Sequence, residues 1–221
     1  MDGSNSSSNH LAIRSFMEEE CWHTTAAGFE RIVMQPIHSA GLQRVYAYGD
    51  GISYHSADTT IDRPLNGSEI DLDGVLPSLR IFAHSVVNNE RINQFLDNIG
   101  GWSSFTIRAY LYPSGSGLTW HTDRKCVAAY VYYVHELWDP AWGGEILLDM
   151  SEQNEPVCKT AADTKLYPSY PGVTASRGVF YLPMPNSLVL FRGGTPHCVK
   201  KVEPAAGNRA RASVSGFFYR D

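Results

Sequence analysis

The sequence predicts a mainly β fold, an antiparallel barrel or sandwich with helices packed on its outside. The first observation is a series of short apolar runs in the second half, each bounded by Gly, Pro, Asn or Asp, at 104–113, 118–123, 126–134, 144–150, 178–183, 187–194, 197–204 and 211–220. The second is helical periodicity at 76–99, where apolar residues recur every three or four positions before a Gly pair. The third is composition, since 221 residues with 43% apolar and 19% charged side chains fit one ordinary globular domain.

The first half carries weaker signals. The polar residues 1–10 are predicted to form a disordered tail, and "LAIRSFMEEE" at 11–20 a short helix. "LQRVYAYGDGISYHS" at 42–56 is rich in β-branched and aromatic residues around a Gly turn, which predicts two strands. We therefore expect a single domain after the tail, with helices and strands at 11–103 supporting a β core at 104–221.

Charge and hydropathy restrict the partners. The net charge is −5 with histidine neutral, and the Lys and Arg residues are scattered, which argues against nucleic acid as a partner. No apolar run reaches the length of a membrane span, and "MDGSNSSSNH" lacks the pattern of a secretory signal. The cysteines, Cys21, Cys126, Cys158 and Cys198, form no CxxC pair. A reducing, cytoplasmic compartment is the simplest interpretation.

One polar segment interrupts the strand pattern. Residues 151–177 carry several Tyr and Pro residues but no periodic apolar pattern. Long loops in compact domains are usually functional or disordered, so we expect a lid that closes over a bound substrate.

A possible metal site begins in "GLTWHTDRK", where His121 and Asp123 stand two positions apart. On a strand, residues two apart point to the same face, although a simple hydrogen-bonded pair has this spacing too. A third candidate ligand is His197, which follows a Gly-Gly-Thr-Pro turn and begins the next strand. Two histidines and one carboxylate leave open positions on Fe(II) for a co-substrate and dioxygen. A catalytic zinc site needs a separate general base, and no HExxH motif is present.

The last apolar run, "RASVSGFFYR", predicts an anion site. Arg211 and Ser213 share one face of this strand by the period of two. A charged guanidinium inside a barrel needs an anion, and its planar fork suits a carboxylate. Arg209 is the competing arginine, but it lies beside a turn and is predicted to be solvated.

Taken in chain order, the "HTD" of residues 121–123, "WDPAWGGEILL", "LVLFRGGTPHCV" and "RASVSGFF" resemble the Fe(II)/2-oxoglutarate-dependent dioxygenases, and more narrowly their prolyl-hydroxylase-like branch. The resemblance spans residues 104–220. It implies a double-stranded β-helix, or jelly roll, in which His121, Asp123 and His197 bind iron. It further implies that Arg211, assisted by Ser213, binds the distal carboxylate of 2-oxoglutarate.

The resemblance also implies roles for residues around these groups. Tyr112 and Tyr133 match positions at which the family places tyrosines near the co-substrate, with core packing as the alternative. Trp120 and Arg124 are expected near the pocket mouth, as candidates for binding substrate.

The implied reaction is oxidation of an unactivated C–H bond with dioxygen, which converts 2-oxoglutarate to succinate and CO2. Ascorbate is a candidate reductant. Hydroxylation of a small molecule, such as an amino acid or a natural-product intermediate, is the main hypothesis, with desaturation or ring formation as variants. Asp123 argues against the halogenating relatives, which have Gly or Ala there. Alternatives are hydroxylation of a prolyl residue in a protein, a non-enzymatic jelly-roll binding module, and nucleic-acid demethylation, whose branch usually has a second arginine on the last strand. The oligomeric state is not predicted.

Overall fold

The computed structural model of the protein describes residues 9–37, 50–64, 68–123, 125–150 and 177–220. Its strands are β1 (His10–Ile13), β2 (Gln35–Pro36), β3 (Tyr54–His55), β4 (Thr59–Asp62), β5 (Ser104–Tyr112), β6 (Leu118–His121), β7 (Ala128–Tyr133), β8 (Ile146–Asp149), β9 (Gly178–Tyr181), β10 (Ser187–Arg192), β11 (His197–Val199) and β12 (Arg211–Tyr219). Its helices are α1 (Glu19–Phe29), α3 (Arg80–Val87) and α4 (Glu90–Asn98), with short 3-10 turns η1 (Pro77–Leu79), η2 (Pro140–Trp142) and η3 (Pro204–Ala206).

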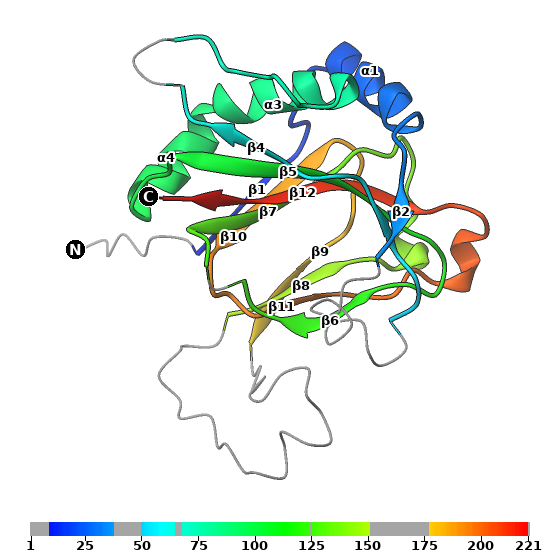
Figure 1. Cartoon of the computed structure of the whole chain (residues 1–221). Helices are drawn as coiled ribbons and strands as arrows, with labels where there is room; N and C mark the ends of the chain where they lie inside the picture. The colour runs from blue at the N-terminus through cyan, green and yellow to red at the C-terminus, as the bar shows by residue number, and fades with distance from the viewer. Residues whose placement is uncertain (1–8, 38–49, 65–67, 124, 151–176, 221) are drawn as a thin grey trace.

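Two antiparallel sheets face one another, and the helices cover the outer face of the larger one (Figure 1). The larger sheet has the order β1-β10-β7-β12-β5-β3-β2, with β4 also paired to β5, and the smaller has the order β6-β11-β8-β9. Every apolar run predicted as a strand in the second half contains one. The predicted mainly β, jelly-roll fold with flanking helices is thereby confirmed.

Strand β7 separates two of the apolar clusters of the structure. Its side chains alternate: Tyr130 and Tyr132 pack among residues beneath the helices, whereas Val131 and Tyr133 pack toward the smaller sheet. All six of its residues are buried, because both faces of a central strand are covered. The larger sheet therefore separates a helix-side core from the interior of the barrel.

The first half of the chain adds strands to the same sheet. Strand β1 pairs with β10, while β3 and β4 both pair with β5. The helix predicted at 11–20 is wrong, because residues 10–13 complete the sheet edge beside β10 and Ser15 has a left-handed φ of 48°. The helix begins instead at Glu19, where acidic side chains suit the positive end of the helix dipole.

The helix predicted at 76–99 is a turn followed by two helices. A break at Asn88 and Asn89 separates α3 from α4, and the Asn89 side chain accepts a hydrogen bond of 3.1 Å from the Ile92 amide. This is a helix N-cap, which begins α4 in a new direction. The predicted stop is confirmed, since Gly100 and Gly101 adopt positive φ values directly after α4.

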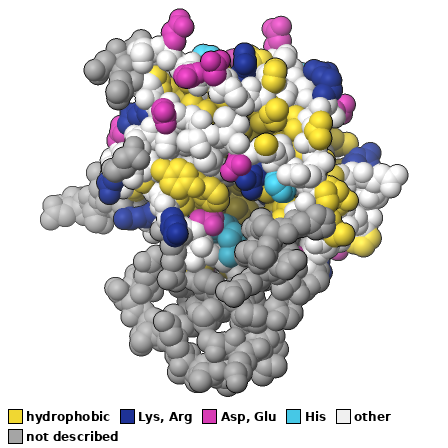
Figure 2. Space-filling view, viewed as in Figure 1, with side chains coloured by type: hydrophobic (Ala, Val, Ile, Leu, Met, Phe, Trp, Pro, Cys, Tyr) yellow, Lys and Arg dark blue, Asp and Glu magenta, His cyan; other side chains and the backbone are white. Residues whose placement is uncertain are grey.

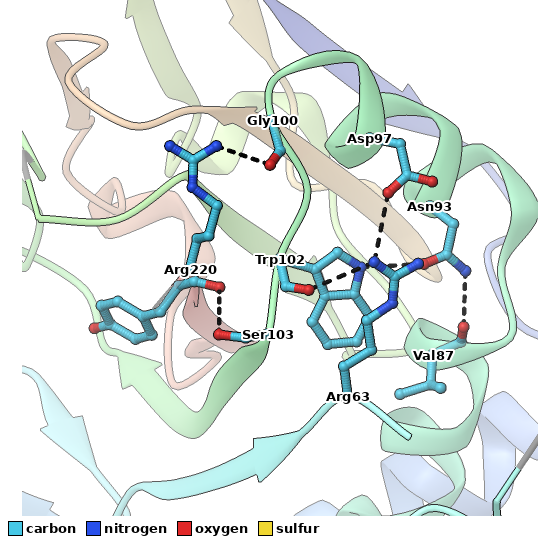
Figure 3. A network of polar contacts seen from close by, with 9 residues as sticks. Arg63, Val87, Asn93, Asp97, Gly100, Trp102, Ser103 and Arg220 are labelled. Carbon is cyan, nitrogen blue, oxygen red and sulfur yellow. Dashed lines mark hydrogen bonds and ion pairs between the residues drawn. The ribbon is translucent and has the colours of Figure 1, made fainter. Parts of the chain in front are cut away.

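Polar contacts join α4 to the C-terminal end of β12 (Figure 3). Arg63 lies 3.5 Å from Asp97 and stacks on the Trp102 ring with its Cζ 5.0 Å from the centroid. Arg220 donates to the carbonyl of Gly100. These contacts lie at the exposed end of the sheet and hold the helices against it.

On the face seen in Figure 2, the described Lys and Arg side chains are scattered, whereas apolar side chains gather in patches and several acidic side chains lie near the top. Among the described residues, none of the helices combines the length and apolar character needed to cross a bilayer. Several sequence predictions fall outside the described residues: the tail at 1–8, the strand at 42–49, Arg124, the lid at 151–176 and Cys158. His10, placed in the tail by sequence, belongs to β1.

His135 lies just after β7, and its ring contacts two other segments, at Pro183 and at Ala212. Its Nε2 donates to the Pro183 carbonyl at 2.7 Å, and its Nδ1 accepts from the Ala212 amide at 3.3 Å. Burial lowers the pKa of His135 to about 4, and the nearby Arg211 charge adds to this effect. The folded protein therefore holds this imidazole neutral.

We predict an acid-sensitive fold that depends on His135. Its folded pKa lies below its ordinary value of 6.5, so its contribution to stability is complete above pH 6.5 and is lost as the pH falls toward 4. The expected loss is about 3 kcal/mol. Urea unfolding above pH 6.5 and near pH 4 measures it. His135→Gln should remove this component, whereas His84→Gln, at an exposed helix position, should retain it; equal acid losses in wild type and His135→Gln would contradict the prediction.

Candidate active site

Three predicted ligands meet at one end of the smaller sheet. His121 is the last residue of β6 and His197 the first of β11, and these two residues lie directly opposite one another in the antiparallel pairing. Asp123 follows two residues later, and its Oδ2 lies 3.3 Å from the His197 Nε2. Ligand atoms of all three residues lie within 4.8 Å of one another. The arrangement can hold one metal ion.

The position of Asp123 differs in one respect from the sequence prediction. Strand β6 ends at His121, so Asp123 lies in the turn beyond it rather than on the same strand face. A backbone hydrogen bond of 2.8 Å from the Gly194 amide to the Asp123 carbonyl holds this turn. The approach is close, since a Cβ on Gly193 would lie 2.0 Å from the Cys126 carbonyl oxygen. The Gly-Gly-Thr-Pro turn before His197 thus also places Asp123.

Both histidines are oriented in the same way. The Nδ1 of His121 lies 2.8 Å from the Thr119 carbonyl, and the Nδ1 of His197 lies 2.9 Å from the Thr195 carbonyl. A carbonyl only accepts, so each Nδ1 carries a proton, and this leaves each Nε2 as the ring atom that can bind a metal. Metal-binding histidines usually donate their other ring N–H in this way, to a backbone carbonyl or a carboxylate, which fixes the orientation of the ring.

The electrostatics favour the protonation states that metal binding needs. Burial and the neighbouring His197 lower the pKa of His121 to about 4. Burial acts to raise the pKa of Asp123, but the hydrogen bond and charge of His197 outweigh it, and the net change is downward. At neutral pH the site therefore offers a neutral imidazole beside an ionised carboxylate.

Arg211 lies on β12 in the interior of the barrel and is 1% exposed. Its Nη1 donates to the Ser213 hydroxyl at 3.3 Å and its Nη2 to the Tyr133 hydroxyl at 3.4 Å. Its Cζ lies 5.2 Å from the ring centroid of Tyr112 and 4.8 Å from that of Tyr133. No ion pair among the described residues includes Arg211, and its Nε is buried without an acceptor. The guanidinium is thus enclosed by aromatic rings and hydroxyls, and it has no carboxylate partner within the described part of the chain.

One glycine packs against Arg211, and the second arginine, Arg209, lies elsewhere. Gly144 has a φ of +77°, and a Cβ there would lie 3.0 Å from the Arg211 Cδ. The Gly-Gly turn after Trp142 therefore packs directly on the arginine side chain. Arg209, by contrast, is exposed and stacks on the Trp142 ring, with its Cζ 4.8 Å from the centroid. Arg209 is exposed because it lies in the loop before β12, whereas Arg211 is the first residue of the strand, as the sequence predicts.

One cavity of about 240 Å³ joins the metal-ligand cluster to Arg211. The three candidate ligands and Arg211 all line it, together with Tyr110 and Tyr112 and the apolar side chains Leu118, Val131, Ile146, Phe191 and Val199. The cavity can therefore hold a small anionic molecule that reaches both the metal site and the buried guanidinium.

The other predicted site residues differ in whether they contact Arg211 or line this cavity. Tyr112 and Tyr133 contact Arg211, and Ser213 is fully buried beside it. Trp120 precedes His121 on β6, is partly exposed, and is not among the described residues that line the cavity. Arg124 lies outside the described residues.

Asp50 is a polar residue that sequence reasoning missed. It is 8% exposed, its Oδ2 accepts from the Thr119 amide at 3.0 Å, and its carbonyl accepts from Gly117 at 2.8 Å. Burial raises the pKa of Asp50, and the Thr119 amide partly offsets this. Since the carbonyl of Thr119 in turn orients His121, the Asp50 carboxylate acts on the ligand through this one residue. No local motif marks Asp50, because its partner lies far along the chain.

We predict that Asp50→Ala weakens divalent metal binding by about 10- to 100-fold, as is typical when a residue that orients a ligand is lost. Asp50→Asn keeps an oxygen acceptor for Thr119 and should recover most of the affinity. Calorimetric titration of the apoprotein with Co(II), together with the Co(II) absorption spectrum, measures both affinity and ligand geometry. Equal affinities in wild type and Asp50→Ala would show that Asp50 does not position His121.

Comparisons with known proteins agree with this geometry. The model of the 2OG-Fe(II) oxygenase superfamily matches residues 105–219. A Pseudomonas putida prolyl-4-hydroxylase has 20% identity and a TM-score of 0.61, over 96% of this chain and 93% of that chain. A 2OG-Fe(II) oxygenase-family oxidoreductase from Burkholderia pseudomallei has 15% identity and a TM-score of 0.56, over 96% and 86%.

A third solved structure, a Trichoplax adhaerens prolyl hydroxylase in complex with a hypoxia inducible factor oxygen degradation domain peptide fragment, has 15% identity and a TM-score of 0.58, over 96% of this chain and 83% of that chain. At these identities the likeness shows a shared fold. No curated protein sequence gives a significant match. Because the family model spans more than half of the chain, the protein belongs to the 2OG-Fe(II) oxygenase superfamily and is an oxygenase that uses Fe(II), 2-oxoglutarate and dioxygen.

Proposed function

We propose that this oxygenase hydroxylates a small molecule at an unactivated C–H bond, with release of succinate and CO2. The observation that carries the proposal is the unpaired Arg211, which shares one small cavity with His121, Asp123 and His197. A buried cation of this kind is costly unless an anion pairs with it. A dicarboxylate co-substrate supplies that anion.

His121, Asp123 and His197 would hold the Fe(II). Two neutral imidazoles and one carboxylate fit this ion, and they leave part of its coordination sphere free. The bound iron supplies dioxygen activation, chemistry that side chains alone do not provide. The chain contributes the orientation of the ligands, through the Thr119 and Thr195 carbonyls.

Arg211 would bind the distal carboxylate of 2-oxoglutarate through its planar fork. Ser213 and Tyr133 accept hydrogen bonds from Arg211, so their own hydroxyl protons remain available for the same carboxylate. Burial raises the pKa of Tyr133, although Arg211 partly opposes this, and the phenol stays protonated. The second aromatic ring beside the guanidinium is that of Tyr112, which makes a cation–π contact with it.

The walls of the cavity exclude water from the reacting centre. Leu118, Val131 and Phe191 line the space around the ligands, and apolar walls leave few positions at which water can hydrogen-bond. Exclusion of water also strengthens the contact between Arg211 and a carboxylate. The enzyme thus binds, orients and shields, while the iron performs the oxidation.

The size of the cavity favours a small substrate. A space of about 240 Å³ holds the co-substrate and little more, so the substrate must enter from the rim beside Asp123. The fold shared with prolyl hydroxylases makes a prolyl residue the second candidate. The unpaired thiols of Cys21, Cys126 and Cys198 suit a reducing compartment, for which we propose the cytoplasm.

Removal of the carboxylate ligand tests the metal site. We predict that Asp123→Gly abolishes conversion of 2-oxoglutarate to succinate. It should also sharply weaken Fe(II) binding, because only two of the three ligands, the histidines, remain. The side chain is 25% exposed, so the fold should persist. Circular dichroism, Fe(II) titration and succinate detection measure these quantities. Succinate formation at the wild-type rate would exclude Asp123 as a ligand.

Removal of the buried guanidinium tests the co-substrate site. Arg211→Ala leaves a carboxylate unpaired, and we expect a loss of roughly 2–5 kcal/mol, or about thirty-fold to several-thousand-fold in 2-oxoglutarate affinity. Arg211→Lys should recover part of this, because an ammonium lacks the fork. Fe(II) affinity should change little, since the ligands lie on other elements.

Arg209→Ala is the matched control, because Arg209 is exposed two residues before Arg211 and should leave 2-oxoglutarate binding unchanged. Anaerobic titration of the Fe(II)-loaded variants with 2-oxoglutarate separates the outcomes. A large loss in Arg209→Ala with none in Arg211→Ala would reverse the assignment. No loss in either would remove the support for 2-oxoglutarate binding at this position.

A further inference from the structure

A second arginine lies on the inner face of the barrel, closer to its rim. Arg108 is on β5, and alternation along the strand places it on the same face as Tyr110 and Tyr112. Its partner across the β5–β12 pairing is Ser215. Tyr110 and Ser215 both line the cavity that contains the metal ligands. Arg108 is not among the described residues that line the cavity, but two of its sheet neighbours are, so it lies directly behind the lining, outside the ligand cluster and the Arg211 site.

Arg108 differs from Arg211 because it has a counter-charge. Its Nη2 lies 2.7 Å from the Asp58 Oδ2, with side-chain exposures of 24% for Arg108 and 58% for Asp58. The Arg108 Nε is buried and has no acceptor among the described residues. The guanidinium is thus only partly satisfied, and the carboxylate keeps an exposed face.

Both groups stay charged at neutral pH. Burial acts to lower the pKa of Arg108, but the Tyr110 hydroxyl and the Asp58 carboxylate outweigh it, and the net change is upward. The hydrogen bond from Arg108 holds the pKa of Asp58 below its usual range. The rim therefore presents a fixed positive and a fixed negative charge side by side.

An open depression of about 240 Å³ lies next to the cavity on this side, lined by Thr122, Asp123, Lys125, Cys126, Phe217 and Tyr219. Thr122, Asp123 and Phe217 also line the inner cavity, so the two spaces meet at the metal ligand. The electrostatic field of Arg108 and Asp58 reaches Tyr219 in this depression. Burial raises the pKa of Tyr219, the charges of Cys126, Asp123 and Asp58 raise it further, and the charge of Arg108 lowers it. A molecule in this depression would lie within the field of Arg108 and Asp58.

The paired charges select among substrate classes. An anion without a cationic group is repelled by Asp58, and a cation without an anionic group is repelled by Arg108. A zwitterion is complementary to both, because its carboxylate can face the guanidinium while its ammonium faces the carboxylate. Lys125, exposed in the neighbouring depression, adds a positive charge that also favours a carboxylate there.

Building on the oxygenase function proposed above, we propose that Arg108 and Asp58 form the substrate subsite, and that the substrate is a free amino acid. Arg108 binds the α-carboxylate and Asp58 the α-ammonium. This orientation leaves the side chain of the amino acid to extend past Asp123 toward the metal.

The test measures binding to the Mn(II)-loaded protein and to the protein loaded with Mn(II) and 2-oxoglutarate. The probes are the standard L-amino acids, each with its methyl ester and its N-acetyl derivative, and saturation-transfer NMR and calorimetry supply the readouts. We expect at least one free amino acid to bind, and both derivatives to bind at least ten-fold more weakly. Arg108→Gln and Asp58→Asn should each weaken the free amino acid by ten-fold or more.

The matched control is Arg63→Gln, which breaks a similar arginine–aspartate pair at the end of α4 that lies outside the cavity (Figure 3). This variant should bind the amino acid as wild type does. Asp58→Asn, at a mostly exposed side chain, keeps the test valid if Arg108→Gln fails to fold.

Three results would overturn the subsite: no amino acid binds to protein that binds 2-oxoglutarate, the derivatives bind as well as the free acid, or Asp58→Asn and folded Arg108→Gln bind as wild type does. Amino-acid binding that depends on Arg108, in a protein that does not bind 2-oxoglutarate, would support the subsite and overturn the proposed oxygenase co-substrate instead.

Discussion

The charge of Arg211 inside the barrel is the constraint on which the active site depends. A fully buried guanidinium without a carboxylate is normally destabilising, and the chain compensates it only in part, with two tyrosine rings and two hydroxyls. The surrounding sequence follows from this. A side chain at Gly144 would crowd the aliphatic part of Arg211. Tyr133 reaches the guanidinium from β7 with its hydroxyl. The remaining deficit of negative charge is what a dicarboxylate ligand would supply.

The metal end of the same cavity rests on backbone pairing. His121 and His197 come from antiparallel neighbours, and their direct opposition brings the ring centroids to 4.1 Å. The pairing of β6 with β11 shifts register between His197 and Val199, which is a β-bulge or a similar irregularity. Such features are common beside active sites because they turn a side chain without breaking the sheet. The Gly194–Asp123 hydrogen bond then adds the carboxylate, so sheet register and one turn position all three ligands.

Local periodicity was sufficient wherever one strand determines which way a side chain points. The choice of Arg211 over Arg209 follows from where β12 begins, and His121 and His197 converge because β6 ends and β11 begins at these paired residues. Features that depend on distant partners could not be predicted. Residues 10–13 form a strand only because β10 offers a free edge, and Asn89 interrupts a continuous apolar pattern by capping α4. Asp50 belongs to no local motif, because its role depends on a hydrogen bond from Thr119, which is far along the chain.

The two interior arginines show how one residue type can specify two ligands in one barrel. Arg211 and Arg108 lie on adjacent strands, β12 and β5, and both face inward. Arg211 has no carboxylate partner among the residues that the structure describes, so its field attracts a ligand group with net negative charge, whereas Arg108 is already paired with Asp58. A second uncompensated cation at the rim would also attract 2-oxoglutarate. Because Asp58 offsets the charge of Arg108, the two proposed sites would differ in net charge, so a dianionic co-substrate would favour Arg211 and a zwitterionic substrate would favour the rim.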